Sequence, residues 1–315
     1  MRNIADLIIG YTLWPQIVVP IIAWYRRASI IICPNYVFPI LCGKKCIVIV
    51  HDISFITDRE PHRVTERPFF SLMESMYFSV VRMSTKIALA RAGGVIVSSE
   101  KVRQEITRNV RTVSAQIFVV PWGVDRRWAK ESLVANCEPN QQPYVLCVNP
   151  HNINAVTRVI TALSRYNCQS TGILPSVKLK LVGHLRDVDD LPPLAEYLGR
   201  VEDSELARLY TNALVVAIAA TNGGFGLPLL EALASGCPCI VTKGTAEAEV
   251  ADGNGVYEIV DDVESWASAI ARVISNPIER QRRSEEGRSW ANLFTWERVG
   301  EQLSEAIETV RGVHL

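Results

Sequence analysis

The chain has 315 residues, more than one hydrophobic core usually holds and suited to two domains of ordinary size. Lysine plus arginine and aspartate plus glutamate each total 33, so the formal net charge is zero. Nucleic-acid-binding proteins usually carry a basic excess, and this balance argues against that class. The eight cysteines form no CxxC pair, and several lie in apolar runs. They predict free, buried thiols of a reducing compartment and no disulfide framework or metal site.

An uncharged apolar stretch, residues 7–25, opens the chain. Its length would suit a membrane-spanning helix, but the two prolines within it would break such a helix. One interpretation is a helix at residues 14–27 that packs on the protein. The other is a peripheral membrane contact, favoured by aromatic and basic side chains, through Trp14, Trp24, Arg26 and Arg27. No signal peptide is recognised, so we expect a cytoplasmic location, with or without attachment to the inner face of the membrane.

Short apolar runs then alternate with helix-period segments, the pattern of parallel sheets covered by helices. In the first half, we predict strands at 29–33, 46–50, 94–97 and 116–120, with helices at 66–91 and 100–108. In the second half, we predict strands at 144–148, 178–182, 197–201, 215–219, 239–242 and 255–259, with helices at 155–165, 203–210, 228–234, 262–275 and 279–291. This order predicts an α/β fold of two doubly wound, Rossmann-like domains that face each other across a cleft.

A polar stretch marks the predicted domain boundary. Residues 126–142 end in Pro-Asn-Gln-Gln-Pro, a composition typical of a linker. We expect the first domain at residues 1–128, the linker at 129–142 and the second domain at 143–294. Ligands of doubly wound sheets bind beyond the carboxyl ends of the strands, where His51-Asp52 and the glycine-rich turn at 223–226 both fall.

The segment 221–240 combines a glycine-rich turn, a short apolar helix with one acid, and a following strand. Three glycines between residues 223 and 226 free the backbone to approach a ligand closely. Pro228 suits the first turn of the helix, whose N–H groups and positive end would attract an anion such as a phosphate. Glu231 follows one turn later, placed to accept hydrogen bonds from hydroxyl groups of the same ligand.

These residues resemble the signature of retaining, nucleotide-sugar-dependent glycosyltransferases of the GT-B fold, family 4 (group 1). Further motifs of that family follow in its order from about residue 13 to the C-terminus: Ile49-Val-His51-Asp52, Val95-Ile-Val-Ser98-Ser99-Glu100, Val119-Val-Pro121-Trp-Gly123-Val-Asp125, Leu181-Val-Gly183, Leu198-Gly-Arg200, Glu249-Val-Ala251 and Phe294-Thr-Trp296-Glu297. The resemblance implies that residues 295–315 form a helix that crosses back to the first domain. It also implies a truncated N-terminal domain, since only a dozen or so residues precede the motifs, and a membrane or protein partner could complete that edge.

The resemblance also implies roles for single residues. Glu231 would bind the ribose hydroxyls, and His51 would be the catalytic residue that contacts the transferred sugar, although a lone histidine is more often structural. The remaining donor-binding residues would be Arg200, near the base, and Gly224, Phe225, Gly226 and Leu227, through their backbone N–H groups.

Two further positions keep a structural alternative. Asp52 is expected to cap or orient its loop. Ser99 could contact substrate or cap the helix that follows it.

Two departures from the family pattern concern the donor site. The family pairs two glutamates eight positions apart, and the place of the first one holds Gly223. The family also has an Arg/Lys pair after the first strand of the second domain, whereas this chain has no lysine or arginine from residue 149 until Arg158. His151 and Arg158 are therefore the possible phosphate contacts.

The implied activity is transfer of a sugar from a nucleoside-diphosphate sugar to a glycan or lipid-linked acceptor, with retention of configuration, in surface polysaccharide or glycolipid synthesis. No metal and no other cofactor is expected, because no Asp-x-Asp motif lies in a suitable loop. The departures also fit a catalytically weakened partner or scaffold subunit with the same fold. A nucleotide-sugar epimerase of this fold is a third, more distant alternative.

Overall fold

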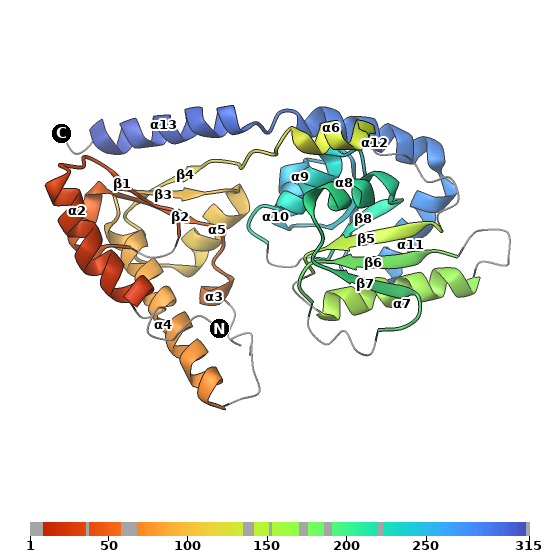
Figure 1. Cartoon of the computed structure of the whole chain (residues 1–315), viewed down its shortest axis with the longest axis horizontal. Coiled ribbons are helices and arrows are strands. Elements are labelled where there is room, and N and C mark those ends of the chain that lie inside the picture. The colour runs from red at the N-terminus through yellow and green to blue at the C-terminus, as the bar shows by residue number, and fades with distance from the viewer. Residues whose placement is uncertain are drawn as a thin grey trace. The chain divides into compact units, whose positions relative to one another are not determined.

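The computed structural model describes residues 9–35, 38–57, 68–134, 142–150, 153–169, 176–185, 191–219 and 223–312. The chain divides into two compact units, Met1–Pro121 with Val299–Leu315, and Trp122–Arg298. Each unit is built around one parallel β-sheet with helices packed on it (Figure 1).

The first unit contains a four-stranded sheet in the order β1-β2-β3-β4. Its strands are β1 (Ile31–Cys33), β2 (Cys46–Val50), β3 (Gly94–Val97) and β4 (Gln116–Val119), and all neighbours are parallel. Its helices are a π-helix (Ile9–Val18), α2 (Val19–Tyr25), a 3-10 helix (Ile40–Lys45), α3 (Ser54–Thr57), α4 (Pro68–Arg91), α5 (Glu100–Asn109) and most of α13 (Trp296–Gly312). The two central strands are fully buried, as expected for β-branched runs covered on both faces.

Helix α13 packs on this sheet. Val310 lies so close to β3 that a Cβ atom on Gly94 would stand 2.9 Å from Val310 Cγ2, and one on Gly93 would stand 2.7 Å from Val310 Cγ1. The two glycines therefore let the C-terminal helix approach the start of the strand. The sheet is thus covered by α13 as well as by the cluster that α4 and α5 form with its strands.

The second unit contains a six-stranded parallel sheet in the order β10-β9-β8-β5-β6-β7. Its strands are β5 (Tyr144–Val148), β6 (Lys178–Val182), β7 (Ala195–Gly199), β8 (Val215–Ile218), β9 (Cys239–Thr242) and β10 (Val256–Ile259). Its helices are α6 (Arg127–Val134), α7 (Ile153–Gln169), α8 (Asp203–Asn212), α9 (Leu227–Ala234), α10 (Ala246–Ala251), α11 (Val263–Ser275) and α12 (Pro277–Ala291).

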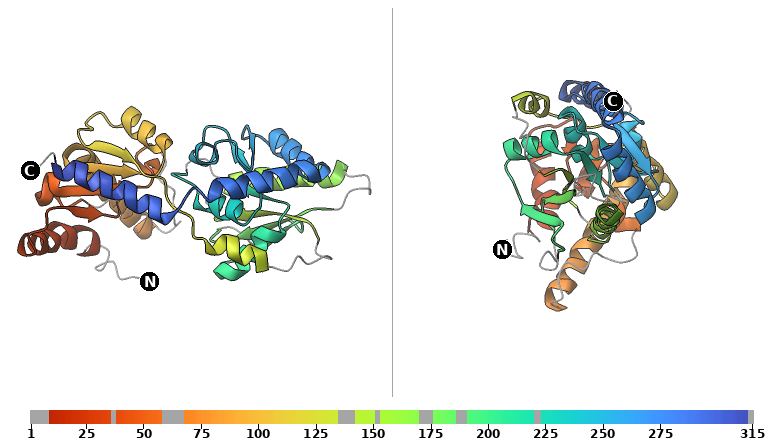
Figure 2. Two further views of the ribbon diagram at one scale, coloured as in Figure 1. Left: turned by 90° about the horizontal axis from the view of Figure 1, so that it is seen from above. Right: turned by 90° about the vertical axis from the view of Figure 1, so that its right-hand side faces the viewer.

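Helices cover both faces of this second sheet (Figures 1 and 2). Along β5, Leu146 and Val148 belong to a core cluster with α8 and α9, whereas Val145 and Cys147 belong to a second cluster with α7 and α11. Successive strand residues point to opposite faces, so the continuous apolar run fills both clusters. The predicted α/β class with two Rossmann-like domains is confirmed, and the order of the second sheet is doubly wound.

Several predicted segments differ in their bounds from the structure, and three of these differences have a visible reason. The linker predicted at 129–142 begins inside α6, because Trp128 is only 3% exposed and packs edge-on against Tyr210, with 5.8 Å between ring centroids. The strand predicted at 197–201 lies two residues earlier, and Gly199, with φ of +67°, ends it. The helix predicted at 14–27 is a π-helix followed by α2, and although Pro15 of the π-helix is buried, α2 has no buried residue.

Candidate functional site

The strand order of the second unit has one switch point, between β5 and β8. The chain winds outward from β5 to β6 and β7, and then returns to the other side of β5 to build β8, β9 and β10. Loops that leave the carboxyl ends of β5 and β8 therefore diverge onto opposite faces of the sheet, and the crevice between them is the usual ligand site of such a fold. The glycine-rich turn is the loop that leaves β8.

Helix α9 begins at this turn. Gly226 is its N-cap residue, with φ of +95°, and its carbonyl oxygen accepts from the backbone N–H groups of Leu229 at 3.0 Å and Leu230 at 3.3 Å. Only glycine adopts this left-handed conformation without strain. Pro228 stands in the first turn, and Leu227 remains 39% exposed on a helix that is otherwise largely buried. The positive end of α9 thus opens at the carboxyl edge of the sheet.

The predicted turn residues have different environments. Gly224 is half-buried, whereas Phe225 is 4% exposed and packs edge-on against Phe294, with 6.4 Å between ring centroids. The Phe225 side chain therefore anchors the turn in the core, and only its backbone is left for a ligand. Thr221 lies outside the described residues.

Glu231 lies on α9, one turn beyond the N-cap, and is partly buried. Its Oε2 accepts a hydrogen bond from Tyr210 Oη at 3.1 Å, and among the described residues no donor contacts its other carboxyl oxygen. Burial raises the pKa of Glu231, while the Tyr210 bond and the charge of Arg127 act in the opposite direction. Arg127 itself pairs with Asp203 at 2.8 Å. One oxygen of Glu231 is thus oriented by the protein and the other remains for a ligand.

The signal for two of these neighbours was weak in the sequence. Tyr210 lies 21 positions before Glu231 and belongs to a different helix, so no local spacing connects them. Arg127 falls in the polar stretch that we interpreted as a linker, and its position in α6 brings it near Glu231.

Two of the predicted residues of the first unit lie at the carboxyl edge of its own sheet. His51 follows β2, is exposed, and its Nε2 lies 3.2 Å from the carbonyl oxygen of Pro34, which follows β1. The expectation for Asp52 is confirmed, since its Oδ1 accepts from the backbone N–H of Ser54 at 3.1 Å and from the Ser54 hydroxyl at 2.7 Å.

Ser99 is the N-cap residue of α5, and its Oγ accepts from Val102 N at 3.3 Å. It is also 1% exposed. The capping interpretation of Ser99 is therefore confirmed.

Of the two predicted phosphate contacts, Arg158 and His151, the structure describes only Arg158. Arg158 forms a two-pronged ion pair with Asp261, with Nε–Oδ1 at 2.9 Å and Nη2–Oδ2 at 2.5 Å, and Trp266 Nε1 donates to the same carboxylate at 3.1 Å. This pair offsets the charge of Arg158 and gives the residue a structural role, and its contact with a phosphate stays a prediction. His151 lies outside the described residues, and Arg200 is exposed directly after β7.

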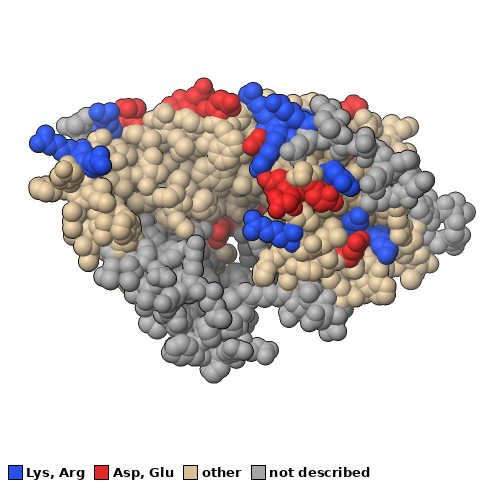
Figure 3. Space-filling model, viewed as in Figure 1, with Lys and Arg blue, Asp and Glu red and all other residues tan. Residues whose placement is uncertain are grey.

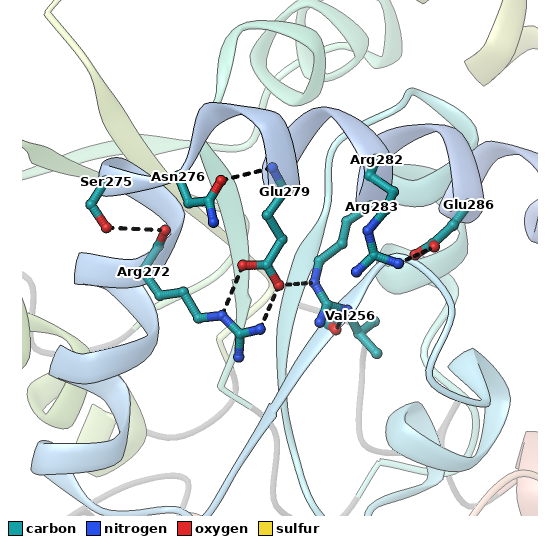
Figure 4. Close-up of polar contacts among 8 residues, drawn as sticks. All are labelled: Val256, Arg272, Ser275, Asn276, Glu279, Arg282, Arg283 and Glu286. Atoms are coloured by element: carbon teal, nitrogen blue, oxygen red, sulfur yellow. Dashed lines mark hydrogen bonds and ion pairs between the residues drawn. The ribbon is translucent and has the colours of Figure 1, made fainter.

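A cavity of about 650 Å³ in the second unit is lined by none of the predicted site residues. It lies beside β10 and α11, where two arginines of its lining are paired: Arg272 and Arg283 share Glu279, at 2.6 Å and 3.1 Å (Figure 4). Arg272 holds the pKa of Glu279 below its usual value, and Arg283 also donates to the carbonyl of Val256. These ion pairs and hydrogen bonds connect α11 and α12 to β10, so the two arginines have a structural role there.

Within the described ranges, no group of three or more histidine, cysteine, aspartate or glutamate side chains is arranged to hold a metal ion. The same residues include no helix long and apolar enough to cross a bilayer.

Comparison with known proteins also identifies the second unit as the part of the chain with a recognised family match. Residues 141–290 match the family model of the group 1 glycosyl transferases. The chain is 26% identical over 260 residues to the MMP alpha-(1->4)-mannosyltransferase of Mycolicibacterium hassiacum, a match that covers 78% of this chain and 61% of that protein. It is 26% identical over 279 residues to the O-antigen chain mannosyltransferase RfbU of Salmonella typhimurium, covering 85% and 70%.

Among solved structures, the sucrose-phosphate synthase of Thermosynechococcus elongatus superimposes with a TM-score of 0.69 at 18% identity, over 96% of this chain and 79% of that one. At this identity the likeness concerns the fold alone. With its parallel sheets and this structural likeness, the chain has the GT-B fold, and its residues 141–290, which include the glycine turn, match the group 1 glycosyl transferases.

Proposed function

We propose that this chain transfers a sugar from a nucleoside-diphosphate sugar to a glycan or lipid-linked acceptor, with retention of configuration and without a metal ion. One observation supports this proposal most strongly. At the switch point of the second sheet, the N-terminal end of α9 lies near the carboxyl group of Glu231, of which only one oxygen is hydrogen-bonded by the protein. The helix end suits the diphosphate, and the free oxygen of Glu231 suits the ribose hydroxyls.

In the proposed mechanism, the acceptor hydroxyl attacks the anomeric carbon on the face from which the nucleoside diphosphate departs. A new glycosidic bond forms, the bond to the diphosphate breaks, and a departing phosphate oxygen takes the hydroxyl proton. Gly224, Phe225, Gly226 and Leu227 would stabilise the departing charge through backbone N–H groups. His51 would contact the sugar, and Arg200 would lie near the base. The protein would act mainly by positioning and by electrostatic stabilisation.

This proposal goes beyond the comparisons, because the chain spans only 61% of the length of the M. hassiacum mannosyltransferase. Its test is calorimetric titration of the full chain with UDP and GDP, followed by assays of donor hydrolysis and transfer with UDP-glucose and GDP-mannose. We expect one nucleoside diphosphate to bind and its sugar to be hydrolysed slowly without acceptor. Absence of binding by both at millimolar concentration would contradict the proposal.

A second candidate is a non-catalytic subunit with this fold. It is favoured by the loop after β5, which has no lysine or arginine, and by Arg158, which is already paired with Asp261. Stabilisation of a leaving phosphate depends strongly on nearby cations. Nucleotide binding without any hydrolysis or transfer would support this alternative.

We also propose that the first unit docks peripherally on an anionic membrane surface. Trp24 is 82% exposed, Tyr25 is 77% exposed and Leu41 is 80% exposed. Gln16 joins the two segments that carry them, because its side chain donates to Phe38 O at 2.7 Å and accepts from Ile40 N at 3.0 Å. Figure 3 shows uncharged side chains over much of this unit, with lysine and arginine at its outer end. Exposed basic residues flank the apolar ones: Arg26, Arg27, Lys44 and Lys45.

Sedimentation with lipid vesicles tests this surface. Because apolar and aromatic side chains insert at the interface and each basic residue adds roughly 1 kcal/mol near an anionic leaflet, we expect binding to phosphatidylcholine–phosphatidylglycerol vesicles, and weaker binding to phosphatidylcholine alone. Replacing both Arg26 and Arg27 by serine should lower the affinity for anionic vesicles about 30-fold. Trp24→Ser should lower the affinity for both kinds of vesicle, and Arg208→Ser, in the second unit, should change neither. Equal, weak sedimentation of all proteins would refute the proposal.

A further inference from the structure

A buried carboxyl group lies against the glycine-rich turn and is used by none of the roles above. Glu247 belongs to the first turn of α10 and is 3% exposed. Thr245 caps the helix, since its Oγ1 accepts from Ala248 N at 3.3 Å. Among the described residues, Glu247 Oε2 has no hydrogen-bond partner. Buried polar atoms of native proteins are nearly always satisfied, so an orphaned carboxyl oxygen beside a helix N-terminus points to a partner supplied by a ligand.

The carboxyl group occupies the space that a side chain at residue 223 would need. A Cβ atom on Gly223 would stand 1.9 Å from Glu247 Oε1 and 2.9 Å from Cδ. A Cβ atom on Gly226 would stand 2.6 Å from Glu247 Cγ. A side chain at either position would therefore force the Glu247 side chain to move, so its present place against the turn depends on both positions being glycine. Gly223 and Glu247 thus form one arrangement, in which α10 supplies a carboxyl group to a turn that lacks one.

The groups around Glu247 indicate which kind of ligand group its carboxyl oxygen would bind. The positive end of α9 attracts an anion, whereas an ionised carboxyl group repels one. A carboxyl oxygen beside an anion site therefore suits a hydroxyl group of the same ligand, and it can accept that hydrogen bond in either protonation state. In a nucleoside-diphosphate sugar, hydroxyl groups flank the diphosphate on both sides. Glu231 is assigned to the ribose side, which leaves the sugar side for Glu247.

We propose that Glu247 recognises the donor sugar, with a carboxyl oxygen that hydrogen-bonds a sugar hydroxyl from the space beside Gly223. This inference rests on the proposed function, and it explains how a chain with Gly223 at the family's first glutamate position still presents an acid at the turn. Oε2 is buried in the ligand-free chain. The sugar therefore reaches it by displacing the turn, which glycine backbone permits most easily.

The test compares the binding of nucleoside diphosphates with that of nucleotide sugars by calorimetry. The proteins are the wild type, Glu247→Gln, Glu247→Ala and the control Glu249→Gln, an exposed acid on the same helix. The probes are UDP, GDP, UDP-glucose and GDP-mannose. For the preferred nucleotide, both Glu247 variants should bind the diphosphate within about threefold of wild type. Glu247→Ala should bind the nucleotide sugar at least about tenfold more weakly, as expected for loss of a hydrogen bond to a charged group. The control should match wild type.

A double variant separates recognition from packing. Gly223→Glu/Glu247→Gly returns a carboxyl group to the turn from the other side of the same space, and it should recover the affinity for the nucleotide sugar. Equal weakening of diphosphate and nucleotide-sugar binding, or unchanged nucleotide-sugar binding in folded Glu247→Ala, would overturn the inference while leaving the proposed function intact. Failure of the wild type to bind any of the four probes would overturn both.

Discussion

Replacing Glu231 by alanine is expected to weaken the binding of the preferred nucleoside diphosphate by roughly 10- to 150-fold. The variant removes hydrogen bonds from ribose hydroxyls to a carboxylate, and bonds to charged groups contribute about 1.5–3 kcal/mol each. One carboxyl oxygen of Glu231 is already fixed by Tyr210, so little orientation is lost when the ligand binds the other. Calorimetric titration measures the change directly.

The same substitution removes the acceptor of a buried hydroxyl group, because Tyr210 is 0% exposed and donates to Glu231. An unsatisfied buried hydroxyl destabilises a protein by about 1–3 kcal/mol, so Glu231→Ala alone should also lower the Tm. Tyr210→Phe/Glu231→Ala removes both partners and should regain most of that stability without regaining affinity. If the double variant bound nucleotide as well as the wild type does, Glu231 would be a structural residue only.

The strands of the second unit were predictable because their signal is local. The strands at 144–148 and 239–242 were predicted with their observed bounds, since a buried parallel strand needs a continuous run of mostly apolar residues between polar turns. The strand at 178–182 was also predicted with its observed bounds, from the alternation of lysine and leucine that ends in valine. The strand at Ala195–Gly199 was misplaced because the sequence does not show where pairing with β6 begins. Register depends on the neighbouring strand, and that information is not local.

The contacts that define the site could not be predicted from local sequence patterns, because they join residues that lie far apart in the sequence. Arg158 pairs with Asp261, 103 positions later, and no local spacing in the sequence indicates this pair. Glu247 lies 24 positions from Gly223 and looks like an ordinary acid near a helix start. A glycine where the family has an acid indicates a lost side chain, and only the folded structure shows which group occupies its space.

The buried acid at Glu247 should also give the protein a distinctive dependence of stability on pH. Burial raises the pKa of Glu247 from its ordinary value of 4.5, and the nearby polar groups of its own backbone and of Thr245 offset this rise only in part. In the pH range between the unfolded and folded pKa values, the native state binds more protons than the unfolded state. The contribution of Glu247 to stability is therefore fully present below pH 4.5 and is lost as pH rises through the folded pKa.

Glu247→Gln is expected to remove this loss, because glutamine has nearly the same shape and does not ionise. At pH 8 the variant should be more stable than the wild type by about 1–3 kcal/mol, the range for a buried group left without a partner, or a Tm higher by roughly 2–10 °C. The difference should shrink as pH falls toward 4.5. Thermal unfolding of both proteins from pH 4.5 to 8, with Glu249→Gln as the exposed control, measures it. If the Tm of the wild type and of Glu247→Gln depended on pH in the same way, the cost of burying the Glu247 carboxylate would be fully compensated by its contacts in the folded chain. If the Tm values of the two proteins converge as the pH falls, ionised Glu247 destabilises the wild type at higher pH. A destabilising acid of this kind is expected where the group is retained to bind a ligand.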